Sequence, residues 1–260
     1  MINTQGVKLT FDKAALSAFT DGELKIIYLF AAISNRLQLQ ETKAFGYWAT
    51  AREESRSQHA RDAAMCGIVE SLITLAGELK EAWEAIQKCY YGTQVARNLN
   101  PKLPQCVQMA LKRCNKHFLG TEIVHYLRNT LAYHHDSEAP LQIAKHLADE
   151  SEHSFFIFPS VGKYFEFATK VRLSAIAIEL KLTDWDWAKV IETLVNILVK
   201  NVYQDIYLVL NGILAELFTK VQLDKETVTE SGIRKWHEMS GEYYMHVDEN
   251  DLSELMRGKR

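Results

Sequence analysis

The sequence predicts an all-α protein, a bundle of about six to eight helices with a long core or interface helix toward its C-terminal end. Of the 260 residues, 47% are hydrophobic and 24% charged, which is typical of a soluble globular protein. Only 12 Gly and 4 Pro are present, too few for the many turns of a β-sandwich or barrel. Apolar residues instead recur at threes and fours over long stretches, as on the buried face of a helix.

Two helices are predicted in the N-terminal part. Thr20 and Glu23 have capping-box spacing, in which each side chain bonds the backbone N–H of the other residue. Apolar positions then follow at helical period: Leu24, Ile27, Tyr28 and Ala31. A longer helix is predicted over about 55–91. Its apolar face comprises Ile68, Leu72, Leu75, Leu79, Trp83 and Ile86.

The middle of the chain is predicted to be two further helices. Asn98–Pro104 is expected to be a loop, because its prolines cannot continue a helix. Helices are expected over Gln105–Phe118 and Thr121–His134. Gly120, between them, stands where a C-terminal cap glycine belongs.

The remaining chain is predicted to contain a short helix and two longer ones. Pro140 opens the short helix, and the aromatic-rich Ser154–Ser160 is expected to be a buried connector. Helices over Lys163–Lys181 and Thr183–Val221 follow, the second about 60 Å long at 1.5 Å per residue. The polar residues from Gln222 onward are expected to form a loose appendage or a small helix.

These elements suggest an N-terminal helical part (1–100), a helical core (101–221) and an acidic tail (222–260), together forming one compact domain. The N-terminal residues lack the pattern of a secretory signal, and the longest uncharged apolar-rich runs have ten residues, against about 20 for a membrane span. The four cysteines form no CxxC pair. We therefore expect a cytoplasmic protein with reduced thiols and no membrane contact.

Charge is distributed unevenly, although the net charge is only −3. The segment Ala85–Thr121 contains six basic residues and no acidic one, and residues 222–256 carry a balance of −6. Local positive charge attracts phosphates even on a slightly acidic protein. Lys112, Arg113 and Lys116 are the candidate substrate-binding residues, and the acidic tail is a candidate to cover them.

The helix after this basic segment contains Arg128, Asn129, His134 and His135, the candidate catalytic residues. Histidine exchanges a proton near neutral pH, and arginine offers a permanent charge with a fork of donors to phosphate oxygens. RNA supplies its own nucleophile, the 2′-hydroxyl, so such a site needs no metal and no cofactor.

Two histidines compete as the partner of Arg128. In a straight α-helix His135 lies about 20° round the axis from Arg128 and about 10 Å along it. His134 lies about 120° away, on the apolar face with Leu127 and Leu131. Straight-helix geometry thus favours His135, whereas a helix that ends or tightens near Tyr133 brings in His134.

Residues Val124–Asp136 resemble the R-x(4–6)-H signature of the HEPN superfamily, in a variant with an aromatic before the histidine and an aspartate after it. HEPN proteins are all-helical, usually dimeric, and many are metal-independent ribonucleases of toxin–antitoxin, abortive-infection and CRISPR-associated systems. The resemblance implies that Arg128 and His134 are the catalytic pair and that Asn129 supports them. It also implies RNA as substrate, a homodimer, and an antitoxin or defence-system partner.

Other functions compete with an endoribonuclease. The main alternative is a non-catalytic helical dimer that binds a protein partner or a nucleotide. Glu122–His125 and Glu150–His153 match the Glu-x-x-His spacing of helical di-iron bundles, a less favoured alternative. Arg52 and His59 also match the looser form of the arginine–histidine pattern, which we interpret as accidental. No glycine-rich phosphate loop or GxSxG elbow occurs.

Overall fold

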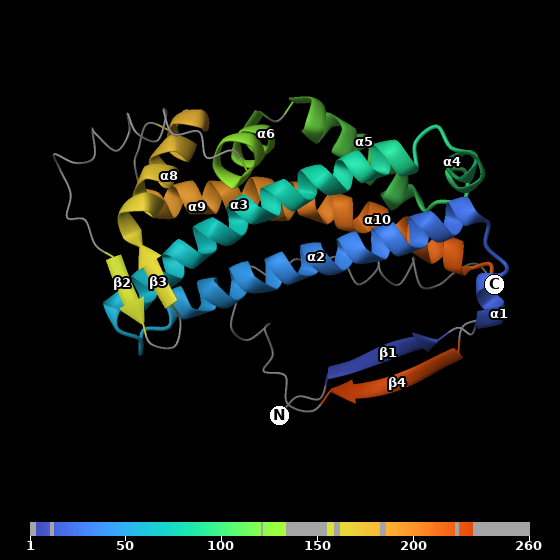
Figure 1. The fold of residues 1–260 in the computed structure, drawn as a ribbon, viewed down its shortest axis with the longest axis horizontal. Helices are drawn as coiled ribbons and strands as arrows, with labels where there is room; N and C mark the ends of the chain where they lie inside the picture. Colours follow the sequence, from blue (N-terminus) through green and yellow to red (C-terminus); the bar gives the residue numbers. More distant parts are fainter. Residues whose placement is uncertain are drawn as a thin grey trace. The chain divides into compact units, whose positions relative to one another are not determined.

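The computed structural model describes residues 4–10, 13–120, 122–133, 155–158, 162–182, 186–221 and 224–230, and helices dominate them (Figure 1). The helices are α1 (Lys13–Leu16), α2 (Asp21–Arg52), α3 (Gln58–Cys89), α4 (Gln94–Leu99), α5 (Gln105–Gly120), α6 (Glu122–Tyr126), α8 (Glu166–Glu179), α9 (Trp187–Leu194) and α10 (Gln204–Phe218), with π-helical η1 (Leu127–Tyr133) and η2 (Val195–Tyr203). The predicted all-α bundle is confirmed. None of the described helices is both long and apolar enough to span a membrane.

The chain forms two compact units. The first comprises 1–36, 82–115 and 204–260, and the second 37–81 and 116–203. Their boundaries therefore fall within α2, within α3, within α5 and at the start of α10, and do not coincide with the divisions expected near residues 100 and 221. The two units alternate along the sequence because the long helices contribute to both.

The capping box at the start of α2 is confirmed. The Thr20 N–H donates to Glu23 Oε2 at 2.9 Å, and the Glu23 N–H donates to Thr20 Oγ1 at 3.4 Å. The predicted buried face of α2 is confirmed at Ile27 and wrong at Tyr28, which is 63% exposed. Ile26 and Phe30 are buried, and Tyr28 is two positions from each, about 200° round the helix.

The predicted apolar face of α3 is confirmed, since none of its six residues is more than 2% exposed. In the second unit this helix approaches α2 closely. A Cβ atom at Gly67 of α3 would lie 2.6 Å from the ring of Tyr47 of α2, so only glycine leaves room for that ring.

Beyond α3, the Thr93 side chain caps α4 and accepts from the Ala96 N–H at 3.1 Å. The loop expected from Asn98 therefore begins only after Leu99.

The predicted long helix near the C-terminal end is confirmed over 187–218, as α9, η2 and α10 in continuous succession. Asp186 caps its start by accepting from the Ala188 N–H at 3.0 Å. Its periodic apolar residues after Trp187 are all buried: Val190, Ile191, Leu194, Leu198, Val202, Ile206, Val209, Ile213 and Leu217. The π-helical segment η2 in its middle was not predicted.

Two small antiparallel sheets correct two sequence-based expectations. The stretch expected to be a buried connector contains β2 (Phe155–Phe158), which pairs with β3 (Gly162–Phe165). The polar tail contains β4 (Asp224–Glu230), which pairs with β1 (Thr4–Thr10), as Figure 1 shows. The rest of the tail and the helix expected at Pro140 lie outside the described residues.

Glu41, in the second unit, accepts a hydrogen bond of 2.6 Å from the Tyr203 hydroxyl. Burial raises the pKa of Glu41, and the bond from Tyr203 only partly offsets this. A carboxyl group with a raised pKa destabilises the fold as the pH rises and the group ionises. We expect Glu41→Gln, which keeps an acceptor for Tyr203, to raise the melting temperature more at pH 8 than at pH 4.5. Exposed Glu54→Gln is the control, and equal shifts at both pH values would contradict the prediction.

Candidate active site

The helix that carries the candidate motif belongs to the second unit and changes character in its middle. It is α-helical over Glu122–Tyr126 and π-helical over Leu127–Tyr133. Buried residues Ile123, Leu127 and Leu131 anchor it, whereas His125 is exposed. Short π-helical segments occur frequently at functional sites. The buried residues thus anchor the helix, and His125 lies on its exposed side.

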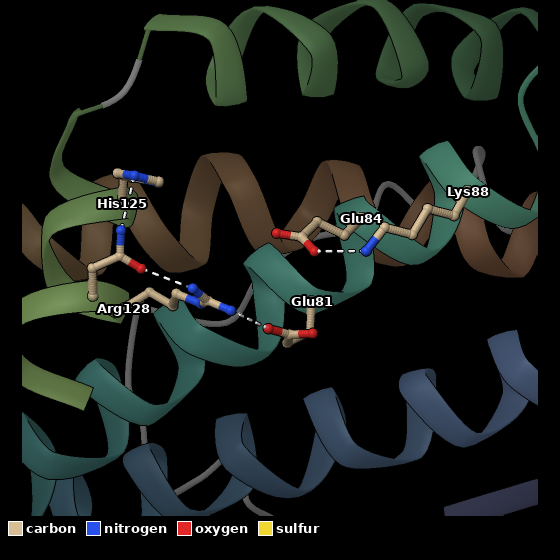
Figure 2. Close-up of polar contacts among 6 residues, drawn as sticks. Glu81, Glu84, Lys88, His125 and Arg128 are labelled. Atoms are coloured by element: carbon tan, nitrogen blue, oxygen red, sulfur yellow. Dashed lines mark hydrogen bonds and ion pairs between the residues drawn. The ribbon is translucent and has the colours of Figure 1, made fainter. Parts of the chain in front are cut away.

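The guanidinium of Arg128 is fixed by two neighbours. Its Nη1 donates to Asn129 Oδ1 at 2.8 Å, and its Nη2 donates to Glu81 Oε1 of α3 at 2.8 Å, as Figure 2 shows. The side chains of Arg128 and Glu81 are 27% and 42% exposed. Arg128 is therefore held in one orientation but remains accessible from solvent.

The same network orients Asn129 and His125. A guanidinium only donates, so the Asn129 amide must turn its oxygen toward Arg128 and its NH₂ group away. That NH₂ group lies 2.8 Å from His125 Nε2, one helical turn earlier. An NH₂ group at this distance pairs with a ring nitrogen that accepts, which corresponds to the His125 tautomer with its proton on Nδ1.

The structure brings together two of the four predicted catalytic residues, Arg128 and Asn129. His134 and His135 lie outside the described residues. The straight α-helix assumed in comparing these two histidines is not found, because the residues after Tyr126 are π-helical. A π-helix has i→i+5 hydrogen bonds and turns less per residue, so the angle that placed His135 beside Arg128 does not hold across this segment.

Sequence reasoning missed Glu81 and assigned His125 only to the alternative metal site. Glu81 is 47 residues before Arg128, and no local pattern pairs the two. His125 is four residues before Asn129, a spacing at which helix side chains meet, so that contact had a usable signal. The described residues contain no cluster of three or more His, Cys, Asp or Glu side chains suited to a metal. Glu150 and His153 lie outside them.

The basic side chains of the segment Ala85–Thr121 differ in their surroundings, because some form ion pairs and others are exposed to solvent. In the first unit, Arg113 makes a bidentate contact with the buried carboxylate of Asp205, with distances of 2.7 to 3.0 Å. These hydrogen bonds raise the pKa of Arg113. Lys88 pairs with Glu84 on α3 at 3.1 Å (Figure 2). Of the three predicted substrate-binding residues, Arg113 therefore has a structural role in its contact with Asp205. Lys112 and Lys116 are exposed.

We expect Arg113→Ala to lower the free energy of unfolding by about 1–2 kcal/mol, because the Asp205 carboxylate loses its bidentate partner while buried. Chemical denaturation of the full chain measures the effect. Lys112→Ala, one residue earlier and exposed, is the matched control and should change stability by less than about 0.5 kcal/mol. Equal free energies of unfolding for the two variants would show that the contact between Arg113 and Asp205 does not stabilise the fold.

Comparisons of the chain with family models, with curated proteins and with solved structures found no match in any of the three.

Proposed function

We propose that the protein is a metal-independent endoribonuclease of HEPN type that cleaves RNA through attack of the 2′-hydroxyl on the adjacent phosphorus. The observation that carries this proposal is the Arg128 guanidinium, which Glu81 and Asn129 hold on a partly exposed side chain and which Asn129 links to the exposed His125. The resemblance over Val124–Asp136 supports it. An arginine and a histidine suit phosphodiester cleavage, because the arginine supplies a permanent positive charge and the histidine exchanges a proton.

Arg128 would stabilise the negative charge that develops on the phosphate oxygens in the transition state. Donors that are already oriented need no reorganisation during the reaction, which makes them effective in catalysis. Glu81 and Asn129 provide this orientation from two sides of the guanidinium. Glu81 also neutralises part of the charge in the resting protein, so an incoming phosphate would compete with its carboxylate for Arg128.

The proposed proton-transfer residue of the motif is His134, with His135 as the alternative. One histidine supplies one of the two proton transfers that the reaction needs, so a homodimer that pairs two such helices completes the proposal. Exposed Lys112 and Lys116 would contact RNA phosphates, and Arg113 would remain with Asp205. A cytoplasmic location and an antitoxin or defence-system partner are further parts of the proposal.

Cleavage of a labelled oligoribonucleotide by the purified full chain in excess EDTA tests the proposal. The matched substrate has the same sequence with 2′-O-methyl groups, which remove the nucleophile. We expect the first to be cleaved and the second to stay intact. An uncleaved oligoribonucleotide would favour the alternative of a non-catalytic binding protein, and cleavage of both substrates would exclude 2′-hydroxyl attack.

A further inference from the structure

We propose that His125 is a catalytic residue of this site, the general base that removes the proton from the attacking 2′-hydroxyl. The inference rests on the proposed ribonuclease activity and goes beyond the arginine–histidine motif, which does not include this residue. It supplies from the same chain the second proton transfer, which the proposed function otherwise takes from a second copy of the motif. It starts from the 2.8 Å contact between His125 Nε2 and the Asn129 amide nitrogen. That contact joins His125 to the Arg128 site within the second unit.

The hydrogen-bond network selects the form of His125 that a base needs. Glu81 and Asn129 Oδ1 both accept from Arg128, so the Asn129 NH₂ group is left to face His125 and donates to Nε2. An imidazolium would present a second donor there and could not accept. The contact therefore requires a ring nitrogen with an available lone pair, which is the nitrogen that can take up a proton.

Of His125, Asn129 and Arg128, the most exposed is His125, so a substrate that enters from solvent would meet it first. His125 is exposed, whereas Arg128 and Asn129 are half-buried. The hydrogen bonds join His125 to Asn129 and Asn129 to Arg128, and Figure 2 labels the two ends of this chain of contacts, His125 and Arg128. A phosphate that reaches Arg128 from solvent would thus bring its neighbouring ribose beside His125.

The proposed step exchanges one proton and one bond at the phosphorus. The 2′-hydroxyl takes the place of the Asn129 amide at His125 Nε2 and gives its proton to that nitrogen, while O2′ bonds to phosphorus. The bond between phosphorus and O5′ breaks, and O5′ takes a proton from the acid of the site, the proposed role of His134. The products are a 2′,3′-cyclic phosphate and a 5′-hydroxyl, and His125 later returns its proton to solvent.

Glutamine at position 125 separates catalysis from structure. In His125→Gln, the new side-chain oxygen can still accept from the Asn129 NH₂ group, but it cannot take up a proton near neutral pH. We expect this variant to lower kcat/KM for RNA by about 10²–10⁴-fold, the usual contribution of a general base. A general base gives the wild-type pH–rate profile an acid limb, and this limb should vanish in the variant. His59→Gln, at an exposed histidine of α3, is the matched control and should behave as wild type.

A second substrate assigns the direction of proton transfer. A uridine 3′-phosphate ester of p-nitrophenol has a leaving group that needs no acid, but its 2′-hydroxyl still needs a base. A general base is therefore equally important for both substrates, and His125→Gln should show the same loss on each. Recovery of the variant on the aryl ester would overturn the assignment of His125 as base.

The other outcomes distinguish this inference from the proposed function. If wild-type protein cleaves RNA and His125→Gln retains full activity, His125 is not catalytic and the ribonuclease proposal stands. An unchanged acid limb in a weakened variant would show a merely structural role and would also overturn the inference. If wild-type protein cleaves no RNA, both proposals fall together.

Discussion

Arg128→Ala is expected to lower kcat/KM for RNA cleavage by about 10²–10³-fold, the effect of removing one preorganised transition-state donor. In wild-type protein the guanidinium is held by Glu81 and Asn129, and the Arg128 side chain as a whole is 27% exposed. Removing it takes away the permanent positive charge of the site. Steady-state rates on an oligoribonucleotide in EDTA measure the effect. Where expression of the wild type arrests host growth, the same variant should relieve the arrest.

Two controls separate catalysis from folding in that experiment. Arg128→Lys keeps the positive charge but loses the planar fork of donors, so we expect it to recover only part of the activity. The Arg52→Ala variant is the second control. Arg52 is exposed and belongs to the second arginine–histidine match, with His59, which we interpret as accidental, so this variant should cleave RNA as wild type does. Full activity of Arg128→Ala would leave the proposed function without its central residue, and thermal unfolding of each variant checks that it is folded.

His134→Ala should lower kcat/KM by about 10²–10⁴-fold, and His135→Ala should change it by less than about threefold. The resemblance over Val124–Asp136 implies His134. The helix geometry that favoured His135 required α-helical turns, whereas the structure has a π-helix over Leu127–Tyr133. Paired rate measurements on the two variants, with the aryl ester beside RNA, decide between the histidines.

If His134 is the acid that protonates O5′, His134→Ala should recover most of its activity on the aryl ester, whose leaving group needs no proton. The contrast with His125→Gln, which should not recover, then assigns one proton transfer to each histidine. A large loss in His135→Ala with little loss in His134→Ala would reverse the assignment and show that the resemblance points to the wrong ring.

The helical class and most of the core could be predicted because helix periodicity is a local property. On α3 and along 187–218, the period alone identified the buried face. On α2 the period correctly identified Ile27 but wrongly included Tyr28, which is exposed and lies about 200° from Ile26 and Phe30.

The strands and π-helical segments could not be predicted for different reasons. The β1–β4 pair joins Thr4–Thr10 to Asp224–Glu230, and such a non-local pairing leaves little trace in either segment alone. The run Phe155–Phe158 is uniformly apolar, so it lacks the alternation that identifies a half-buried strand. A π-helix has no sequence signature comparable to a capping box, so η1 and η2 were treated as ordinary helix.

The candidate site was only partly predictable for a related reason. Arg128 and Asn129 are adjacent, so a motif could name both. Glu81 reaches Arg128 from another helix, and only the tertiary structure shows that contact. His125 was assigned to a metal ligand pair by its spacing from Glu122, whereas its spacing from Asn129 describes its actual partner.

We propose that Arg128 acts on an RNA phosphodiester without a metal, and the chemistry of the product ends distinguishes this reaction from hydrolysis by an activated water. Wild-type protein and Arg128→Ala are incubated with one oligoribonucleotide in excess EDTA, and the fragments are analysed by mass. We predict that wild type leaves 2′,3′-cyclic phosphate and 5′-hydroxyl ends and that the variant leaves almost none. Fragments with 5′-phosphate and 3′-hydroxyl ends, or identical yields from both proteins, would contradict the claim.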